Sequence, residues 1–318
     1  NDAAKPIGIK DLRLMLLENQ LPIVGIGGIT QDSLTELSAI GLDGLAVISL
    51  LTEAENELTE LSKLNFVSNM SQELFEEKVA KAKELIRNGD MFQVVLSQRL
   101  TADFTDNPFN YYRKLRVENP SSYMYFMEFD NFHVIGSSPE RLVAVHGNQV
   151  STNPIAGTRK RGQTEFEDQA LIEDLESDPK EVAEHKMLVD LGRNDIGKIS
   201  KYGSIEVPVF MKVEKYRYVM HITSEVTGEL RPEFTAMDAL RATLPAGTLS
   251  GAPKHRAYQR IYEFETQKRG IYGGAIGYLT KNGNCDFAIA IRTMVLKDKK
   301  AHVQAGAGIV YDSVPEHE

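Results

Sequence analysis

Apolar and polar residues are arranged differently in the first fifty residues and in the rest of the chain. "LPIVGI" and "GLAVIS" have the pattern of short buried strands, and "TQDSLTELSAI" between them has that of a helix. Thr30 suits the N-cap of this helix, and Gly41 suits the position after its last turn. The pattern predicts one βαβ unit over residues 1–50. The acidic, polar segment 51–65 is the predicted linker.

Beyond residue 65 the predicted strands and helices fall into separate groups. "SQELFEEKVAKAKELIRNGD" has the spacing of an amphipathic helix, with Ser71 as N-cap and Gly89 as its stop. Strand patterns follow in "MFQVVLSQRL", "SYMYFMEF", "FHVIGSSPERLVAV" and "NQVSTNPIAG". Helical patterns occupy much of 165–266, and strands return from residue 273. This grouping predicts an α+β domain over 66–318, with a large, mostly antiparallel sheet and flanking helices.

Composition narrows the class of protein. The chain has 318 residues, of which 42% are hydrophobic and 25% charged, as in ordinary globular proteins. A net charge of −9 argues against general nucleic-acid binding, and no apolar run approaches the roughly 20 residues that span a bilayer. One cysteine, Cys285, excludes an internal disulfide and indicates a reducing compartment, so we expect a cytoplasmic protein. The chain begins without Met and ends without a helix stop, so we expect both ends to be cut.

An acidic helix start is the first candidate for chemistry. Asp178 and Pro179 suit the beginning of a helix, which places Glu181 and Glu184 on one helical face. Two carboxylates at this spacing suit a hard cation such as Mg²⁺. A solvated acidic helix start, favoured by the helix dipole, explains the same pattern.

Other polar residues interrupt apolar or glycine-rich stretches. His221 ends an apolar run in "YVMHITSEVTG", where a lone histidine is more often structural than catalytic. Thr248 lies in "PAGTLSGAPKHRA", which is either an anion-binding helix start or a plain Gly/Pro loop. Gly306 and Gly308 follow a strand and suit either a ligand lying on the backbone or a bulge. Arg292, within an apolar strand, is expected to bind a carboxylate.

Taken together, these phrases resemble the chorismate-utilising enzymes, most closely anthranilate synthase component I. The resemblance covers about residues 64–318. It rests on eight phrases in the same order: "GDMFQVVLSQR", "SSPERLV", "PIAGTRKRG", "LVDLGRNDIGK", "YVMHITSEVTG", "PAGTLSGAPK", "YGGAIGY" and "QAGAGIVYDSVPE".

Two positions separate the chemistries of this family. Members that add water to chorismate have a lysine base where this chain has Gln93, and water needs such a base. Aminodeoxychorismate synthases have a nucleophilic lysine where this chain has Ala156. The resemblance therefore implies an anthranilate synthase-type lyase, which converts chorismate and ammonia to anthranilate and pyruvate in the first step of tryptophan biosynthesis. Two alternatives stay open: a fragment that binds chorismate or a glutaminase subunit without turnover, and aminodeoxychorismate synthase component I.

The resemblance also implies roles for individual residues. Glu184 would be a Mg²⁺ ligand, with Glu181 beside it. Glu140 would protonate the departing ring hydroxyl, His221 would move a proton in the aromatising step, and Thr248 would hydrogen-bond within the site. The implied substrate-binding residues are Gly157 and Thr158 for one carboxylate, and Tyr272, Arg292, Gly306, Ala307 and Gly308 for the enolpyruvyl carboxylate. Lys160 and Arg161 would add to the local positive field.

Partners and regulation follow from the same resemblance. The family's glutaminase chemistry resides on a second subunit, and no nucleophilic-cysteine motif of a glutamine amidotransferase is found in this chain, so ammonia would come from a partner or from solution. The family's second metal carboxylate lies beyond residue 318, so we expect the catalytic domain to be truncated at its C-terminus and to bind Mg²⁺ more weakly. Part of a tryptophan feedback site is retained in Ser122, Tyr123 and Met124.

The N-terminal fifty residues resemble a different family. They are similar to the C-terminal part of thiamine phosphate synthases and thiazole tautomerases, which are TIM barrels. That resemblance implies a vestigial phosphate site at Gly28, Ile48 and Ser49. Because one βαβ unit does not close an eight-stranded barrel, we expect no thiamine-type catalysis.

Overall fold

The computed structural model describes residues 24–26, 44–46 and 63–318. At the N-terminal end, β1 (Val24–Ile26) and β2 (Gly44–Ala46) pair in parallel, as expected for the two strands of a βαβ unit. The helix predicted between them, Gly28, Ile48, Ser49 and most of the predicted linker lie outside the described residues. The division into a βαβ unit, a linker and a catalytic domain stays a prediction.

Within residues 63–318 the strands form two seven-stranded antiparallel sheets, where the sequence had predicted one large sheet. The first has the order β10-β11-β8-β7-β14-β13, and β9 also pairs with β11. Its strands are β7 (Arg141–His146), β8 (Gln149–Thr152), β9 (Ile155–Lys160), β10 (Glu206–Lys215), β11 (Val219–Glu229), β13 (Ala275–Leu279) and β14 (Cys285–Ile289).

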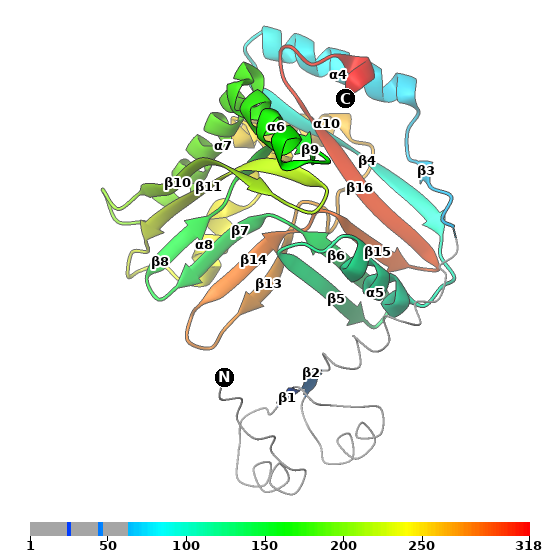
Figure 1. The fold of residues 1–318 in the computed structure, drawn as a ribbon, viewed down its shortest axis with the longest axis horizontal. Coiled ribbons are helices and arrows are strands. Elements are labelled where there is room, and N and C mark those ends of the chain that lie inside the picture. Colours follow the sequence, from blue (N-terminus) through cyan, green and yellow to red (C-terminus); the bar gives the residue numbers. More distant parts are fainter. Residues whose placement is uncertain (1–23, 27–43, 47–62) are drawn as a thin grey trace, which may run out of the picture.

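The second sheet has the order β12-β4-β16-β15-β6-β5, and β3 also pairs with β4. Its strands are β3 (Val67–Ser68), β4 (Gln93–Asp103), β5 (Tyr123–Phe129), β6 (Phe132–Ser138), β12 (Gly251–Ala252), β15 (Thr293–Lys297) and β16 (Lys300–Ile309). Figure 1 shows β4 and β16 lying side by side along their length, in the continuous register from Lys300↔Asp103 to Ile309↔Val94.

Two short segments carry the chain between the sheets. Residues 139–140 connect β6 to β7, and residues 290–292 connect β14 to β15. Backbone hydrogen bonds fix both segments, since Ile289 N–H donates to the Glu140 carbonyl and Ser137 N–H donates to the Arg292 carbonyl. Polar residues of these segments are thus held where the two sheets meet.

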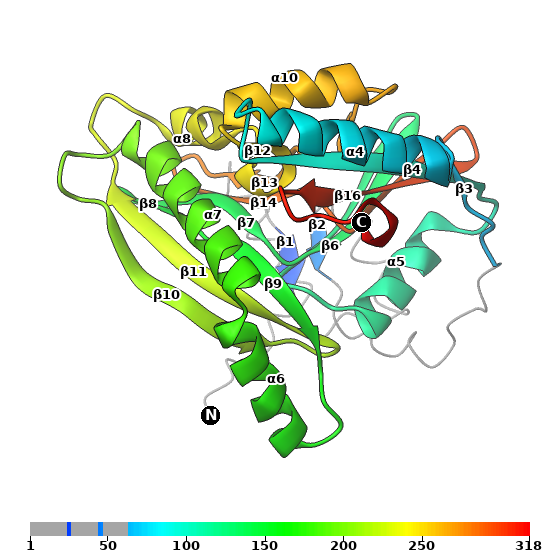
Figure 2. The same ribbon diagram turned by 90° about the horizontal axis from the view of Figure 1, so that it is seen from above.

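Helices cover the two sheets separately. They are α4 (Gln72–Arg87), α5 (Pro108–Glu118), α6 (Glu165–Ser177), α7 (Pro179–Gly197), α8 (Ala236–Thr243), α9 (Gly247–Ser250), α10 (Lys254–Phe264) and the 3-10 turn η2 (Pro315–His317). Figure 2 shows α4 and α10 along β4, and α7 along β9 and β11. Among the described residues no helix is long and apolar enough to cross a membrane.

Local sequence signals account for the helix ends that matter most for the site. Ser71 caps α4 by accepting a hydrogen bond from Leu74 N–H, and Gly89 follows the helix with φ 78°. Asp178 caps α7 by accepting from the N–H groups of Lys180 and Glu181. The predicted starts of α4 and α7 are therefore confirmed. The sequence prediction missed α5, which begins after the N-cap Asn107, and the edge strand β10.

Each sheet has its own hydrophobic core. The larger cluster joins β7, β8 and β11 to α7 and α8, and the second joins β4 to α4 and α10. In α4 the buried residues Phe75, Val79 and Ala82 recur at helical spacing, so one face packs on the sheet. The two cores therefore hold each sheet together with its own helices.

Candidate functional site

Glu140 and Arg292 lie on the two segments that connect the sheets. Glu140 is 6% exposed, and burial raises its pKa to about 8, although the Thr248 hydroxyl and the backbone of Ile155 oppose the rise. Glu140 is therefore protonated at neutral pH and is a proton donor. Thr248 is in α9, and its buried Oγ1 has no hydrogen-bond partner of normal geometry in the described part of the chain.

His221, on β11, has an unpaired buried nitrogen. Its Nδ1 lies 2.9 Å from the Gly157 carbonyl oxygen and 3.1 Å from Thr158 Oγ1. Because a carbonyl only accepts, Nδ1 carries the proton and Nε2 is the acceptor. Nε2 is buried and has no partner among the described residues. Burial lowers the pKa of His221, and the charge of Arg292 lowers it further, so the ring is a neutral base.

Tyr216 joins this group, although the sequence did not single it out. Its ring packs edge-on against His221, with centroids 5.5 Å apart. Burial raises the pKa of Tyr216, and the charge of Glu214 adds to the rise. The Tyr216 hydroxyl donates to Glu214 Oε2 at 3.4 Å.

Arg292 has a backbone conformation that is rare for a bulky residue. Its φ is 48°, in the left-handed region, where such residues cluster at functional sites. Desolvation of the guanidinium lowers its pKa, even though the residue as a whole is exposed. No ion pair of Arg292 is found within the described ranges, so its charge is available to an anionic ligand.

The two carboxylates of the acidic helix α7 differ in their surroundings. Glu184 Oε1 accepts a hydrogen bond of 2.9 Å from Gln93 Nε2. Burial raises the pKa of Glu184, and the charges of Glu181 and Glu318 add to the rise. Glu181 instead forms an ion pair of 3.2 Å with Arg159. Glu184 is therefore the carboxylate of the two that has no ion pair among the described residues, although the charge of Lys180 opposes the rise of its pKa.

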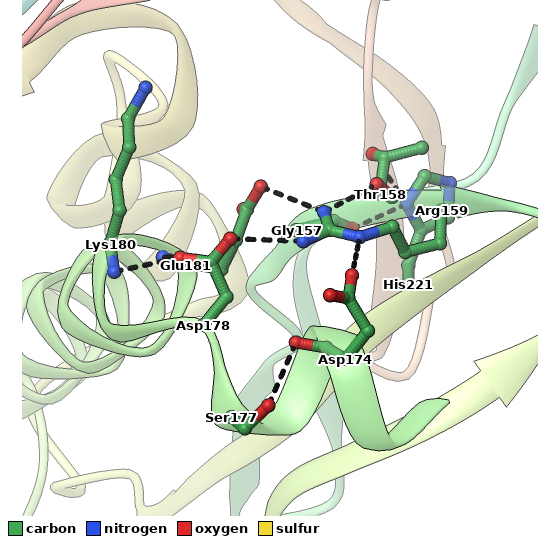
Figure 3. A network of polar contacts seen from close by, with 9 residues as sticks. All are labelled: Gly157, Thr158, Arg159, Asp174, Ser177, Asp178, Lys180, Glu181 and His221. Atoms are coloured by element: carbon green, nitrogen blue, oxygen red, sulfur yellow. Dashed lines mark hydrogen bonds and ion pairs between the residues drawn. The ribbon is translucent and has the colours of Figure 1, made fainter. Parts of the chain in front are cut away.

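Arg159 is a second residue that the sequence prediction missed. Figure 3 shows its guanidinium surrounded by three carboxylates, at 2.6 Å from Asp174, 2.9 Å from Asp178 and 3.2 Å from Glu181. It ties α6 to the start of α7, and the acidic run 165–178 was the available sequence signal. Arg161 is likewise bound, to Asp168. Arg161 is thus largely neutralised, contrary to the expectation that it adds a positive field.

Two glycines connect the acidic helix to the other groups. A Cβ on Gly157, whose φ is 70°, would lie 3.3 Å from Glu181 Oε2, while the Gly157 carbonyl binds His221. A Cβ on Gly308 would lie 2.9 Å from Gln93 Nε2 and 3.6 Å from Glu184 Oε1. The backbones of β9 and β16 therefore pass directly beside the two carboxylates.

Gly306 extends the site to Tyr272. A Cβ on Gly306 would lie 3.0 Å from the Tyr272 hydroxyl, and burial raises the pKa of Tyr272 to about 12. Contacts among the described residues thus link the predicted site residues in small sets. Thr248 acts on Glu140, Gly157 and Thr158 bind His221, Gly308 lies beside Glu184, and Gly306 lies beside Tyr272.

The predicted feedback residues lie apart from this group, on and beside β5. Tyr123 donates to Asp286 (2.8 Å) and accepts from Arg141 (2.8 Å). Ser122 and Tyr123 line a separate cavity of about 270 Å³, whose wall includes Tyr216. Met124 pairs with Ser137 across β5 and β6. Tyr216 therefore borders both the candidate site and this cavity.

The carboxylate pair fits Mg²⁺ if the ion takes its other ligands from water or substrate. In the part of the chain that the structure describes, no group of three or more His, Cys, Asp or Glu residues is arranged to hold a metal ion. The observation that favours a cation is that burial and two neighbouring carboxylates raise the pKa of Glu184, while Gln93 and Lys180 oppose the rise only in part. Magnesium ordinarily binds through one or two carboxylates and keeps several waters.

Comparisons with known proteins agree on one family. Residues 21–318 match the chorismate binding enzymes. Anthranilate synthase component 1 of Lactococcus lactis is 88% identical over 321 residues, covering 98% of this chain and 70% of that protein. The same enzyme of Acetivibrio thermocellus is 59% identical over 269 residues, covering 83% of this chain and 54% of that protein. The match to the Lactococcus protein includes most of the first 65 residues, whose similarity to thiamine phosphate synthases stays a prediction.

A solved structure shows the same fold. The crystal structure of anthranilate synthase component I from Streptococcus pneumoniae superposes with a TM-score of 0.77 at 54% sequence identity, covering 91% of this chain and 64% of that chain. The predicted α+β fold is confirmed. This chain spans between about half and 70% of the length of these relatives.

Proposed function

Since the chain belongs to the family of chorismate binding enzymes, we propose that it carries out the anthranilate synthase reaction. Chorismate and ammonia would give anthranilate, pyruvate and water, in the first step of tryptophan biosynthesis. The observation that carries this proposal is that the chain has a buried acid with a raised pKa, Glu140, and a histidine with a lowered pKa, His221, whose buried Nε2 has no partner among the described residues. High identity to named anthranilate synthases supports the same reaction.

The residues support a division of labour. The guanidinium of Arg292 and the hydroxyl of Tyr272 would bind the enolpyruvyl carboxylate, beside the backbone of Gly306 and Gly308. Glu140 would give its proton to the ring hydroxyl as the carbon–oxygen bond breaks, so that the hydroxyl leaves as water while ammonia bonds to the ring; the ring-bound ammonium would then return a proton to the Glu140 carboxylate. His221 Nε2 would accept the ring proton as the bond from the ring to the enolpyruvyl oxygen breaks and the ring becomes aromatic. That proton would pass to the methylene carbon of the released enolate, which becomes pyruvate.

Magnesium would act at the other end of the substrate. We propose that Glu184, with Glu181 beside it, holds Mg²⁺. When bound, the ion would neutralise the ring carboxylate of chorismate. Gln93 would orient Glu184 through its 2.9 Å hydrogen bond.

The nucleophile would come from outside the chain. Gln93 is 2% exposed with its amide on Glu184, and Ala156 lies in strand β9, so neither position supplies a lysine base or nucleophile. Ammonia needs no such base. We propose that a glutamine amidotransferase subunit supplies it, as in the family, and that the chain works in the cytoplasm. The buried free Cys285 is consistent with a reducing compartment.

Product identification tests the proposal. The purified chain is incubated with chorismate, an ammonium salt and Mg²⁺, and anthranilate fluorescence and pyruvate are measured. We expect equal amounts of both products. Glu184→Gln should strongly reduce the signal at low Mg²⁺ concentration, while Glu173→Gln, on the exposed surface of α6, should leave it unchanged. Recovery of intact chorismate, or of an aminodeoxychorismate that keeps its enolpyruvyl group, would contradict the proposal.

A second candidate function is chorismate binding without turnover. The observation that favours it is that the chain spans only 54% and 64% of the length of two of its relatives. Calorimetric titration with chorismate distinguishes the two, since binding without any product supports this alternative.

A further inference from the structure

A buried ion pair lies behind the predicted substrate-binding residues and takes no part in the proposed chemistry. Arg269 and Glu265 have side chains only 10% and 8% exposed. Arg269 Nε donates to Glu265 Oε2 at 2.9 Å, and Nη2 donates to Oε1 at 2.6 Å. Such a pair is weak evidence for stability, because desolvating two charges costs about as much as their attraction returns. The contacts that the pair makes with its surroundings are more informative.

The pair is bound to β4 at the two residues that face the site glycines. Arg269 Nη2 donates to the Val95 carbonyl at 2.7 Å. Glu265 Oε1 accepts from the Ser97 N–H at 2.9 Å and from the Ser97 hydroxyl at 2.7 Å. In the β4–β16 register, Val95 is the partner of Gly308 and Ser97 is the partner of Gly306. The ion pair therefore fixes the strand directly opposite both glycines.

Arg269 also contacts the other two elements of this end of the site. Its Nη1 donates to the carbonyl of Leu249, the residue that follows Thr248 in α9. Its guanidinium carbon lies 5.5 Å from the centre of the Tyr272 ring. The Tyr272 hydroxyl in turn approaches Gly306, where a Cβ would lie 3.0 Å away. One guanidinium thus reaches β4, α9 and Tyr272.

We propose that Arg269, held by Glu265, is a positioning residue for the subsite that binds the enolpyruvyl carboxylate of chorismate. This inference rests on the proposed function. Arg269 acts through Tyr272, whose position relative to the backbone of Gly306 and Gly308 it sets. A planar guanidinium with donors in a fixed fork serves three acceptors at once, whereas the single ammonium of lysine does not. Replacing Arg269 should therefore weaken the binding of ligands that carry this carboxylate more than the binding of ligands that lack it.

Two ligands that differ in one carboxylate provide the test. These are 3-(1-carboxyvinyloxy)benzoate and 3-(vinyloxy)benzoate, whose inhibition constants are measured for the native chain and for Arg269→Lys. We expect the native chain to prefer the carboxylated ligand. Arg269→Lys should reduce this preference by about tenfold, a loss typical of a displaced charged hydrogen bond, and change the affinity for the other ligand by less than about twofold. The KM for chorismate should rise while the KM for ammonium stays constant.

The matched control is Arg260→Lys. Arg260 lies on α10, is 19% exposed and binds Asp90 and Glu263 away from the subsite, so both inhibition constants should stay constant. Where Arg269→Lys does not fold, Glu265→Gln keeps the shape of the side chain and tests the same linkage, with the same selective loss expected.

Failure of the inference differs from failure of the proposed function. If the native chain makes anthranilate and the variant keeps its full preference, or loses affinity equally for both ligands, Arg269 is only structural. If the native chain makes no anthranilate and shows no preference between the ligands, both the function and the inference are wrong.

Discussion

Glu140 offers the sharpest quantitative prediction, because protonation of its buried carboxyl group should affect both the stability of the fold and the proposed catalysis. The perturbation is Glu140→Gln, which keeps the size of the side chain and removes the titration. Burial raises the pKa of Glu140 to about 8 from the ordinary 4.5, while in the unfolded chain the carboxyl group ionises near its ordinary value.

The sign and size of the effect follow from this difference. Between the two pKa values the folded state binds a proton that the unfolded state does not bind. The free energy of unfolding therefore falls as the pH rises from about 4.5 to about 8. A shift of this size is equivalent to about 5 kcal/mol at most, at about 1.4 kcal/mol per pH unit. Above the pKa of about 8 that Glu140 has in the folded chain, this contribution to the free energy of unfolding is lost completely.

Urea unfolding of both proteins at several pH values measures this effect. We expect Glu140→Gln and the native chain to have similar stability at pH 5. At pH 8.5 the variant should be more stable, by up to about 5 kcal/mol. Its kcat for anthranilate should be lost at every pH, whereas the native kcat/KM should fall above about pH 8. A stability difference that does not change with pH would refute the reasoning.

Three further outcomes are expected from particular contacts. Glu184→Gln should raise the Mg²⁺ concentration needed for half-maximal activity more than Glu181→Gln does, because Arg159 already neutralises Glu181. If a Mg²⁺ titration shows that both variants raise this concentration equally, the assignment of Glu184 as the main ligand is wrong. Gly308→Ala places a Cβ 2.9 Å from Gln93 Nε2, so the KM for chorismate should rise by about tenfold or more while the melting temperature stays unchanged. In the control Gly197→Ala the added Cβ has nothing within 4 Å, so the KM for chorismate should not change. Ile135→Ala, at a fully buried position, should lower the free energy of unfolding by about 2–5 kcal/mol in urea titrations; a loss below about 1 kcal/mol would show that the core around it is not close-packed.

Helix ends were predictable because their signals are local. Ser71 and Asp178 cap the helices that the sequence assigned to them, since each oxygen bonds to N–H groups two or three residues away. Helix α5 was missed although Asn107 and Pro108 form a similar start, because none of its residues is fully buried and its apolar pattern is weak. The division into two sheets was also missed, because strand patterns do not specify which strands pair.

The same distinction applies to the candidate site. Glu184, His221 and Arg292 were noticed as polar residues that break or follow a regular pattern. Tyr216, Arg159 and Arg269 were not, since their contacts join different elements. Tyr216 packs on His221 of β11, Arg159 of β9 binds Asp174 of α6 and Glu181 of α7, and Arg269 reaches Val95 of β4. Spacing along one element does not reveal such contacts.

The central claim is that one chorismate molecule spans the junction of the sheets, from Glu184 to Arg292. A crystal structure of the chain with chorismate and Mg²⁺ tests this most directly. The account predicts the ring carboxylate beside the ion at Glu184, the ring hydroxyl beside Glu140, and the enolpyruvyl carboxylate beside Arg292 and Tyr272. Chorismate bound elsewhere, or with these groups in separate cavities, would contradict the account.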